Sequence, residues 1–396
     1  MGAESSKTKE FKNIDPEEIR KFTEIFKAAT NGKDKISRET FIDTFTTLGD
    51  FSNQFYLRLV KREPTGILHL RTLLKCIDGA LGTFESQAST LKSCFGDTKD
   101  QIMRNTVKIY CESIGLVRED QVRLFDYFDA ENKRETEELA NFFSECPLFP
   151  YCSAYIFHRL IGKPGDSKMP VIDAKSEIIG KIDLLVLNSH LPFDRRKSWT
   201  LLYQMSAHGQ SFSQLVKRIN GEGPVLVAIR SSKGKRFGFF ANNGFRSGPT
   251  YHGTAECFLF SLSPRVQVFS ATGRTDNYAY LNYQQQSLPN GIGIGGQEDV
   301  WPLLIREEFG SGICQKNSRY FEPCFVSDEE EFKLKMLEVW RVGDKPEKTF
   351  EEQMEPKKTD KSIIDKDPEA RAVLEMAGKS MHSEAYREPA PLLDEQ

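Results

Sequence analysis

The sequence contains no long hydrophobic run, and nothing in it approaches the about 20 consecutive apolar residues that a membrane-spanning helix needs. Its first residues are polar, so we expect no secretory signal. Its eight cysteines include no Cys-x-x-Cys pair, which argues against a zinc site and for reduced cytosolic thiols. A net charge of −3, from 54 basic and 57 acidic residues, gives no general attraction to nucleic acid. We therefore expect a cytoplasmic protein without bound metal.

The sequence also lacks the common catalytic signatures. It has no G-x-S-x-G elbow, so His208 and Ser211 are better interpreted as a turn followed by a helix N-cap than as a nucleophile and its base. The glycine cluster at 291–296 lacks the Lys-Ser/Thr that completes a P-loop, and close backbone packing explains it better than anion binding. Cys257 lies in an apolar segment, where thiols are usually inert. We expect no enzyme and no cofactor.

Two acidic residues keep an alternative open. Glu256 and Glu338 can act as an acid and base pair if the fold brings them together. A glutamate on a strand more often accepts hydrogen bonds from backbone donors or pairs with a basic group. These two glutamates are the polar residues to test first for such a pair.

The first part of the chain predicts a helical domain. Ile19, Phe22 and Phe26 have helical spacing behind the N-cap Asp15, and Ile36 and Phe41 then follow in a pattern that resembles an EF-hand loop. A second copy places Gly66 and Leu68 in the same relation. The calcium-ligand positions hold Ala29, Lys33 and Thr40 in the first copy, and Lys61 and Thr72 in the second. We interpret the region as a degenerate EF-hand-like helical domain without metal.

Short apolar runs rich in β-branched and aromatic residues dominate residues 199–342 and predict antiparallel sheet. The runs are Val225–Ile229, Phe237–Ala241, Cys257–Leu262, Val266–Phe269, Tyr278–Tyr283 and Leu337–Val342. A strand is also expected at Trp199–Gln204, a helix near Ser211, and a lead-in helix at Ile178–Leu187. The whole chain is therefore expected to be an α+β protein.

The order of these motifs resembles the TLDc-domain family. The carrying segments are 201–203 (Leu-Leu-Tyr), 208–215 (His-Gly-Gln-Ser-Phe-Ser-Gln-Leu), 223–226, 237–241, 258–262, 271–278, 288–297 (Leu-Pro-Asn-Gly-Ile-Gly-Ile-Gly-Gly-Gln) and 337–340 (Leu-Glu-Val-Trp). The resemblance implies a β-sandwich flanked by helices. Within the family, the helical domain, the Met-Gly start and the tail are similar to a myristoylated, lysosome-associated branch linked to target-of-rapamycin (TOR) signalling.

That resemblance implies binding to the vacuolar proton-pumping ATPase and resistance to oxidative stress. The partners it implies are this ATPase, components of the TOR pathway and, through a myristoyl group, the lysosomal membrane. The alternative is an oxidation-resistance protein with a thiol-based or unidentified enzymatic activity. Gly2 fits the M-G-x-x-x-[ST] acylation pattern. Asp367 and Pro368 predict the start of a short amphipathic helix in the tail, which we expect to contact the partner.

The expected domains are a flexible N-terminus at 1–14, the EF-hand-like domain at 15–165, the TLDc domain at 171–342, and a linker with a C-terminal helix at 343–396. The expected partner-binding residues are Asp367, Val373, Leu374, Met376 and Ala377. The residues expected to hold the TLDc motifs in shape are His208, Gly209, Ser211, Phe212, Gly273, Pro289, Asn290, Gly291, Gly293, Gly295, Gly296, Glu338 and Trp340.

Overall fold

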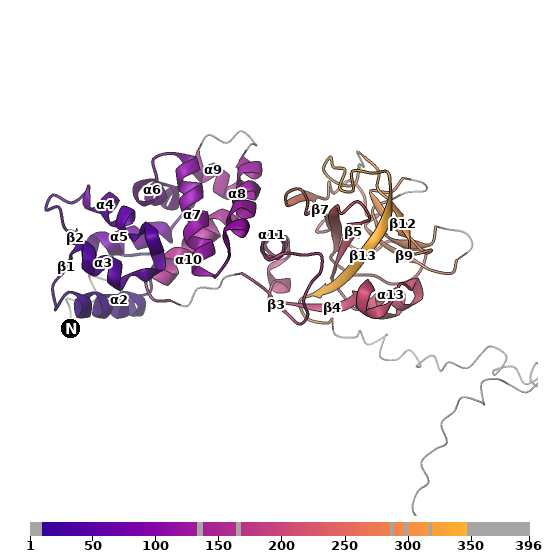
Figure 1. Cartoon of the computed structure of the whole chain (residues 1–396), viewed down its shortest axis with the longest axis horizontal. Coiled ribbons are helices and arrows are strands. Elements are labelled where there is room, and N and C mark those ends of the chain that lie inside the picture. Colours follow the sequence, from indigo (N-terminus) through magenta and orange to yellow (C-terminus); the bar gives the residue numbers. More distant parts are fainter. Residues whose placement is uncertain are drawn as a thin grey trace, which may run out of the picture. The chain divides into compact units, whose positions relative to one another are not determined.

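The structure of the protein is a computed structural model that describes residues 10–132, 138–163, 168–285, 289–296, 300–316 and 319–346. The chain divides into two compact units, Met1–Lys345 and Pro346–Gln396, and the elements below belong to the first. Helices come first in the sequence and strands follow (Figure 1). The α+β class predicted from the sequence is confirmed.

The helical region begins with two EF-hand-like halves. The first is α2 (Pro16–Ala29), β1 (Lys35–Ile36) and α3 (Arg38–Thr44), and the second is α4 (Ser52–Val60), β2 (Leu68–His69) and α5 (Leu70–Ala80). β1 and β2 pair antiparallel, with Ile36 opposite Leu68, and both side chains are fully buried. Asp15 caps α2 by accepting a hydrogen bond from the Glu17 backbone N–H at 2.8 Å. Thus the loops keep the packing residues that join an EF-hand pair.

Five further α-helices complete the described helical region, together with the 3-10 helix η1 (Thr46–Phe51) that precedes α4. They are α6 (Phe84–Cys94), α7 (Lys99–Ser113), α8 (Arg118–Asn132), α9 (Leu139–Glu145) and α10 (Leu148–Leu160). The sequence predicts a break over 146–152 because of two prolines, yet only Pro147 separates helices. Pro150 lies in the first turn of α10, where backbone N–H groups have no helical partner to lose.

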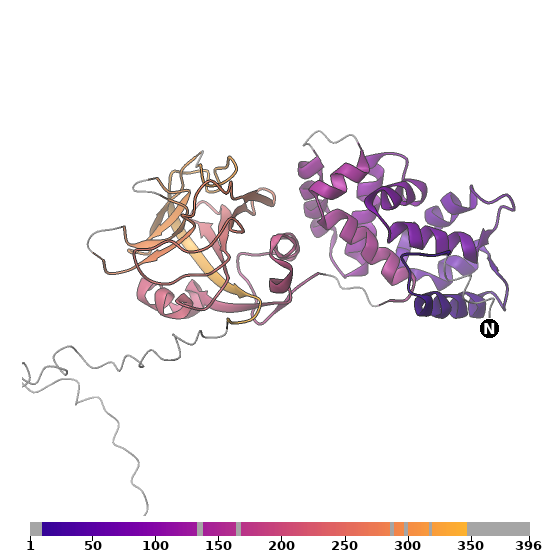
Figure 2. The ribbon, with the colours of Figure 1, turned by 180° about the vertical axis from the view of Figure 1, so that it is seen from behind.

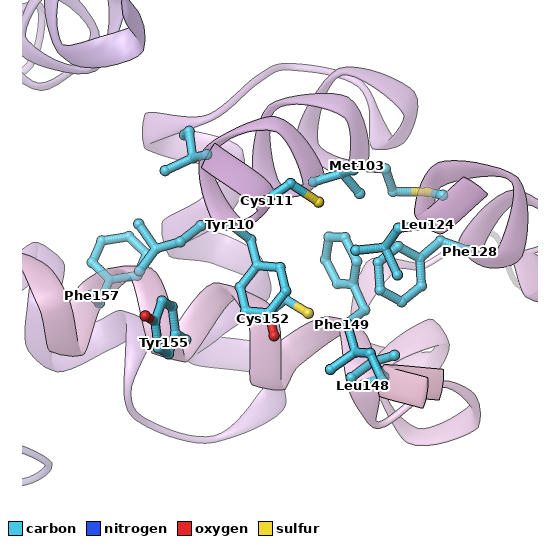
Figure 3. Packing of buried hydrophobic residues seen from close by; sticks show 14 of the residues in the cluster. Met103, Tyr110, Cys111, Leu124, Phe128, Leu148, Phe149, Cys152, Tyr155 and Phe157 are labelled. Carbon is cyan, nitrogen blue, oxygen red and sulfur yellow. The ribbon is translucent and has the colours of Figure 1, made fainter. Parts of the chain in front are cut away.

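Aromatic side chains fill the core between α7, α8 and α10 (Figure 3). Tyr110 of α7 and Tyr155 of α10 meet edge to face, with ring centroids 5.3 Å apart. Phe128 of α8 and Phe149 of α10 meet in the same way at 5.1 Å. Such contacts add to the stability that burial of the rings provides.

The strand-rich region forms two sheets that share one long strand, β13 (Glu331–Val342). The first sheet has the order β8, β7, β6, β5, β13, β4, β3, and the second has the order β9, β10, β11, β12, β13. The strands of the first are β3 (Val171–Ile172), β4 (Ser198–Gln204), β5 (Val225–Ser231), β6 (Arg236–Ala241), β7 (Phe258–Ser261) and β8 (Gln267–Ser270). Those of the second are β9 (Ala279–Asn282), β10 (Gly291–Ile294), β11 (Leu303–Arg306) and β12 (Ser311–Ile313).

A buried apolar cluster joins the two sheets face to face. Val227 and Phe239 of the first sheet belong to the same cluster as Ile292 and Ile305 of the second, and all four are fully buried. The helix α13 (Phe212–Ile219) adds its apolar side to this core, next to β4 (Figure 1). Seen from behind, β13 crosses the middle of the strand-rich region (Figure 2). The predicted sandwich therefore has its core between the two sheets.

The other face of the first sheet is covered by α11 (Lys181–His190). Leu184 and Leu185 pack in one cluster with Trp199 of β4 and Trp340 of β13. The sequence predicts this helix at Ile178–Leu187, three residues too early. The backbone N–H groups of Ile178 and Ile179 are instead bonded to the Ser176 hydroxyl, which delays the start of the helix.

The glycine cluster at 291–296 includes the strand β10. β10 runs antiparallel between β9 and β11. A Cβ atom on Gly291 would lie 2.4 Å from the Ile305 carbonyl oxygen, and one on Gly293 would lie 2.6 Å from the Leu303 carbonyl oxygen. The backbone of β10 therefore lies so close to that of β11 that a side chain at either glycine would clash.

Candidate functional site

The His208–Ser211 motif follows β4 and the short helix α12 (Met205–His208). His208 Nδ1 accepts a hydrogen bond from the Gln204 backbone N–H at 3.0 Å, and Gly209 has a φ of 80°, which favours glycine. Burial, followed by the charge of Arg218, lowers the pKa of His208 from its ordinary value, so the imidazole is held in its neutral, accepting form. The histidine thereby closes the turn at the end of β4.

Ser211 is the N-cap of α13. Its Oγ accepts from the Gln214 backbone N–H at 3.4 Å and lies 2.9 Å from the Ser213 hydroxyl. Phe212 packs into the sandwich core beside Phe309, with ring centroids 6.0 Å apart. Among the hydrogen bonds between described residues, none joins His208 to Ser211. The motif is engaged in local structure.

Glu338 of β13 is fully buried, and its carboxylate accepts four hydrogen bonds. Oε1 accepts from the Glu177 backbone N–H at 2.6 Å and from Gln204 Nε2 at 3.2 Å. Oε2 accepts from the Ser176 hydroxyl at 2.5 Å and from Trp340 Nε1 at 3.0 Å. Every partner is a donor, so the carboxylate is satisfied on both oxygens. Glu338 thereby fastens the segment before α11 to the centre of the sheet.

Glu256 does not meet Glu338. It precedes β7, which is three strands away from β13, a separation of roughly 14 Å at about 4.8 Å per strand. Its carboxylate instead accepts from Asn242 Nδ2 at 3.0 Å. An acid and base pair made of these two side chains is therefore wrong.

A second buried carboxylate, missed in the sequence, belongs to Asp183 of α11. Its side chain is fully buried and pairs with Arg236 of β6, at 2.7 Å, and with Arg123 of α8. Asp183 Oδ2 also accepts from the Gly180 backbone N–H at 2.9 Å. The sequence gives one indication that Asp183 is buried, because it is the acidic residue inside the apolar run of 182–187. Buried charges of this kind are usually paired, so the residue type predicts a basic partner without identifying it.

Burial raises the pKa of two of the cysteine thiols in the strand-rich region. Cys257 is buried, and burial raises the pKa of its thiol to about 11. Cys324 is the partly exposed cysteine, and burial likewise raises its pKa to about 12. Thiolates are the reactive species, and both thiols are protonated at neutral pH. This weakens the thiol-based alternative.

The remaining sequence-predicted positions do not gather at one place. Gly295 and Gly296 follow β10, and Gly296 approaches the Trp301 ring. Pro289 accepts from the Tyr280 hydroxyl at 2.8 Å, and Asn290 donates to Glu307 at 3.2 Å. Gly273 has a φ of 68° in the segment between β8 and β9. Gly2 and the tail residues Asp367, Val373, Leu374, Met376 and Ala377 lie outside the described residues.

No group of three or more His, Cys, Asp or Glu side chains in the described part of the chain could hold a metal ion. A search of the same residues finds no helix long and apolar enough to cross a membrane.

Comparison with known proteins identifies the strand-rich region. The model of the TLDc domain family matches residues 172–343. The strand-rich region is therefore similar to the TLDc domain.

Among its relatives is the MTOR-associated protein MEAK7. The protein of Gallus gallus is 42% identical over 221 residues, which cover 54% of this chain and 46% of the relative. That of Homo sapiens is 39% identical over 214 residues, covering 53% of this chain and 45% of the relative. Oxidation resistance protein 1 of Xenopus tropicalis is 30% identical over 177 residues, covering 44% of this chain and 20% of the relative. The matched region spans less than half the length of each of these relatives.

Proposed function

We propose that this protein is a non-enzymatic regulator at the cytoplasmic face of the lysosome. It binds the vacuolar proton-pumping ATPase through its TLDc domain and its C-terminal helix, and links the pump to TOR signalling and resistance to oxidative stress. An N-terminal myristoyl group on Gly2 contributes to its place on the membrane.

The observation that carries the proposal is the use of the TLDc motif residues as structural supports. His208 closes a turn, Ser211 caps a helix and Glu338 is saturated with donors inside the domain. Because these polar groups are used inside the domain, the outer surface is the part that we propose contacts other molecules. One relative is named as an MTOR-associated protein and another as an oxidation resistance protein. These names support the proposed link to TOR signalling and oxidative stress.

Affinity purification from detergent-solubilised lysosomal membranes tests the proposal. We expect the full-length chain to recover subunits of the ATPase, and a variant that ends at Gly343 to recover far less. Val373→Asp with Leu374→Asp removes the apolar face of the expected tail helix and should act like the truncation. Leu392→Asp with Leu393→Asp introduces the same charges in the same tail outside that helix, and should retain binding.

Recovery of no pump subunits by the full-length chain would refute the proposal. Equal recovery by both tail variants and the full-length chain would refute the role of the tail helix. Gly2→Ala tests a separate step, because its expected effect is loss of membrane recruitment in cells with unchanged recovery from detergent.

A further inference from the structure

The two most exposed large hydrophobic side chains among the described residues, Phe193 and Val171, lie on neighbouring segments at one edge of the TLDc domain. Phe193 is 77% exposed and Val171 is 74% exposed, and Ile172, next to Val171, is 40% exposed. Val171 and Ile172 form β3, the outermost strand of the first sheet, and Phe193 begins the 3-10 helix η2 (Phe193–Arg195) just before β4. These three residues are called the edge patch below.

The two segments that carry the edge patch are held together. The Val171 backbone N–H donates to the Lys197 carbonyl oxygen at 3.0 Å. The amide of Asn188 donates to the Lys168 carbonyl oxygen at 2.9 Å and to the Arg196 carbonyl oxygen at 3.0 Å. The patch is therefore presented on an ordered edge of the domain.

A pocket of about 390 Å³ continues the apolar surface from Ile172 inward. Its floor includes the rings of Trp199 and Trp340. Both indole N–H groups are already used, by Asn188 Oδ1 at 3.0 Å and by Glu338 Oε2 at 3.0 Å. Both rings are only 1% exposed, so they close the inner end of the pocket, while Ile172 and Ile179 lie among its other lining residues.

Basic residues outnumber acidic ones in the segments that carry this apolar surface, and one of them, Arg195, is paired with Asp194 at 3.0 Å. Residues 168–197 contain six basic residues, Lys168, Lys175, Lys181, Arg195, Arg196 and Lys197. The same range contains four acidic residues, and one of these, Asp183, is fully buried between two arginines. Lys175 and Lys181 border the pocket itself. In a chain whose net charge is −3, this edge is locally cationic.

We propose that the edge patch and its basic border bind the surface of an anionic lipid membrane. Val171 and Phe193 enter the headgroup region, and the lysines and arginines lie against lipid phosphates. The inference rests on the proposed membrane location and adds the second contact that it needs, because one myristoyl chain holds a protein only weakly. Phosphatidylserine is taken as the probe.

Vesicle co-sedimentation with unacylated full-length protein tests the edge alone. We expect binding to vesicles that contain phosphatidylserine in phosphatidylcholine and little binding to phosphatidylcholine alone, with the binding weakened by salt. Val171→Ser with Phe193→Ser should lower the partition coefficient at least about fivefold, since two exposed apolar side chains no longer insert. The matched control is Val117→Ser with Val122→Ser, at positions that are 56% and 54% exposed in another part of the chain.

The control pair should bind like the wild type. Equal binding by the edge variant and the control, or no binding of the wild type to anionic vesicles, would overturn the inference. Pump recovery from detergent is measured on the same edge variant and should be unchanged. Failure of the lipid contact is thereby distinguished from failure of the proposed function.

Discussion

Replacing Glu338 by glutamine tests whether the hydrogen bonds of this buried carboxylate stabilise the TLDc domain. The substitution keeps the shape of the side chain and exchanges one acceptor oxygen for a donor NH₂. If the amide oxygen takes the place of Oε1, it still accepts from Glu177 and Gln204. The NH₂ then faces the Ser176 hydroxyl, which already accepts from the Ile178 and Ile179 backbone N–H groups, and the Trp340 N–H, which cannot accept.

The opposite orientation is worse, because the NH₂ then faces both the Glu177 N–H and the Gln204 amide. A buried donor without an acceptor costs about 1–3 kcal/mol. The remaining hydrogen bonds also become weaker, because their acceptor is no longer charged. We expect Glu338→Gln to lower the free energy of unfolding of the TLDc domain by about 3 kcal/mol. Glu338→Ala removes all four acceptor contacts and leaves a cavity, so its loss should be larger, about 5 kcal/mol.

Tryptophan fluorescence during urea unfolding measures this loss in the right domain. The chain has three tryptophans, Trp199, Trp301 and Trp340, and all three lie within the matched TLDc region. Their emission therefore reports the TLDc domain in the full-length chain. A loss of 3 kcal/mol corresponds to a fall of roughly 6–12 °C in Tm for a domain of this size.

The matched control is Glu331→Gln on the same strand. Glu331 is 71% exposed and pairs with Arg306 at 2.7 Å, so its loss should change stability by less than about 1 kcal/mol. If Glu338→Gln is no more destabilising than Glu331→Gln, the four-donor arrangement does not hold the domain together and the reasoning is refuted.

Three further predictions concern local structure. Ser211→Ala should destabilise the TLDc domain by about 1 kcal/mol through loss of the α13 cap, and an unchanged urea midpoint would contradict this. Gly238→Ala should prevent folding or cost more than about 3 kcal/mol, because its Cβ would lie 1.9 Å from the Val227 carbonyl oxygen; a soluble variant with wild-type fluorescence would contradict it. Burial, then Lys163, lowers the pKa of His158 from its ordinary 6.5, so the unfolded chain binds this proton more readily. Stability should therefore fall as the pH drops below about 6.5, and less so in His158→Gln, as followed by circular dichroism.

Local sequence patterns predict much of this fold because they act over a few residues. The run Val225–Ile229 becomes β5, and the cap at Ser211 starts α13 where the sequence places it. The packing pair Ile36 and Leu68 is also visible in the sequence, since EF-hand loops have a fixed spacing. Each of these features depends on residue type and on near neighbours.

The strands β10 and β12 are not predicted, because glycine-containing segments have weak intrinsic strand preference and acquire it from their neighbours in the sheet. The partners of the two buried acids cannot be predicted for a related reason. Glu338 meets Ser176 across 162 positions, and Asp183 meets Arg236 across 53. No local pattern selects such partners, and only the fold brings them together.

These two buried acids have a consequence for the surface of the domain. Glu338 holds Ser176 and the Glu177 backbone, and Asp183 holds Gly180 and the start of α11, so the segment between β3 and α11 is fastened to the sheet twice. That segment carries Lys175 and borders the apolar pocket of the proposed membrane contact. A carboxylate inside the domain can thus control an outer binding surface by fixing the position of the chain that forms it. Glu338 and Asp183 are therefore best explained as residues that hold this surface segment in place. In variants of either residue, loss of binding has to be distinguished from loss of folding.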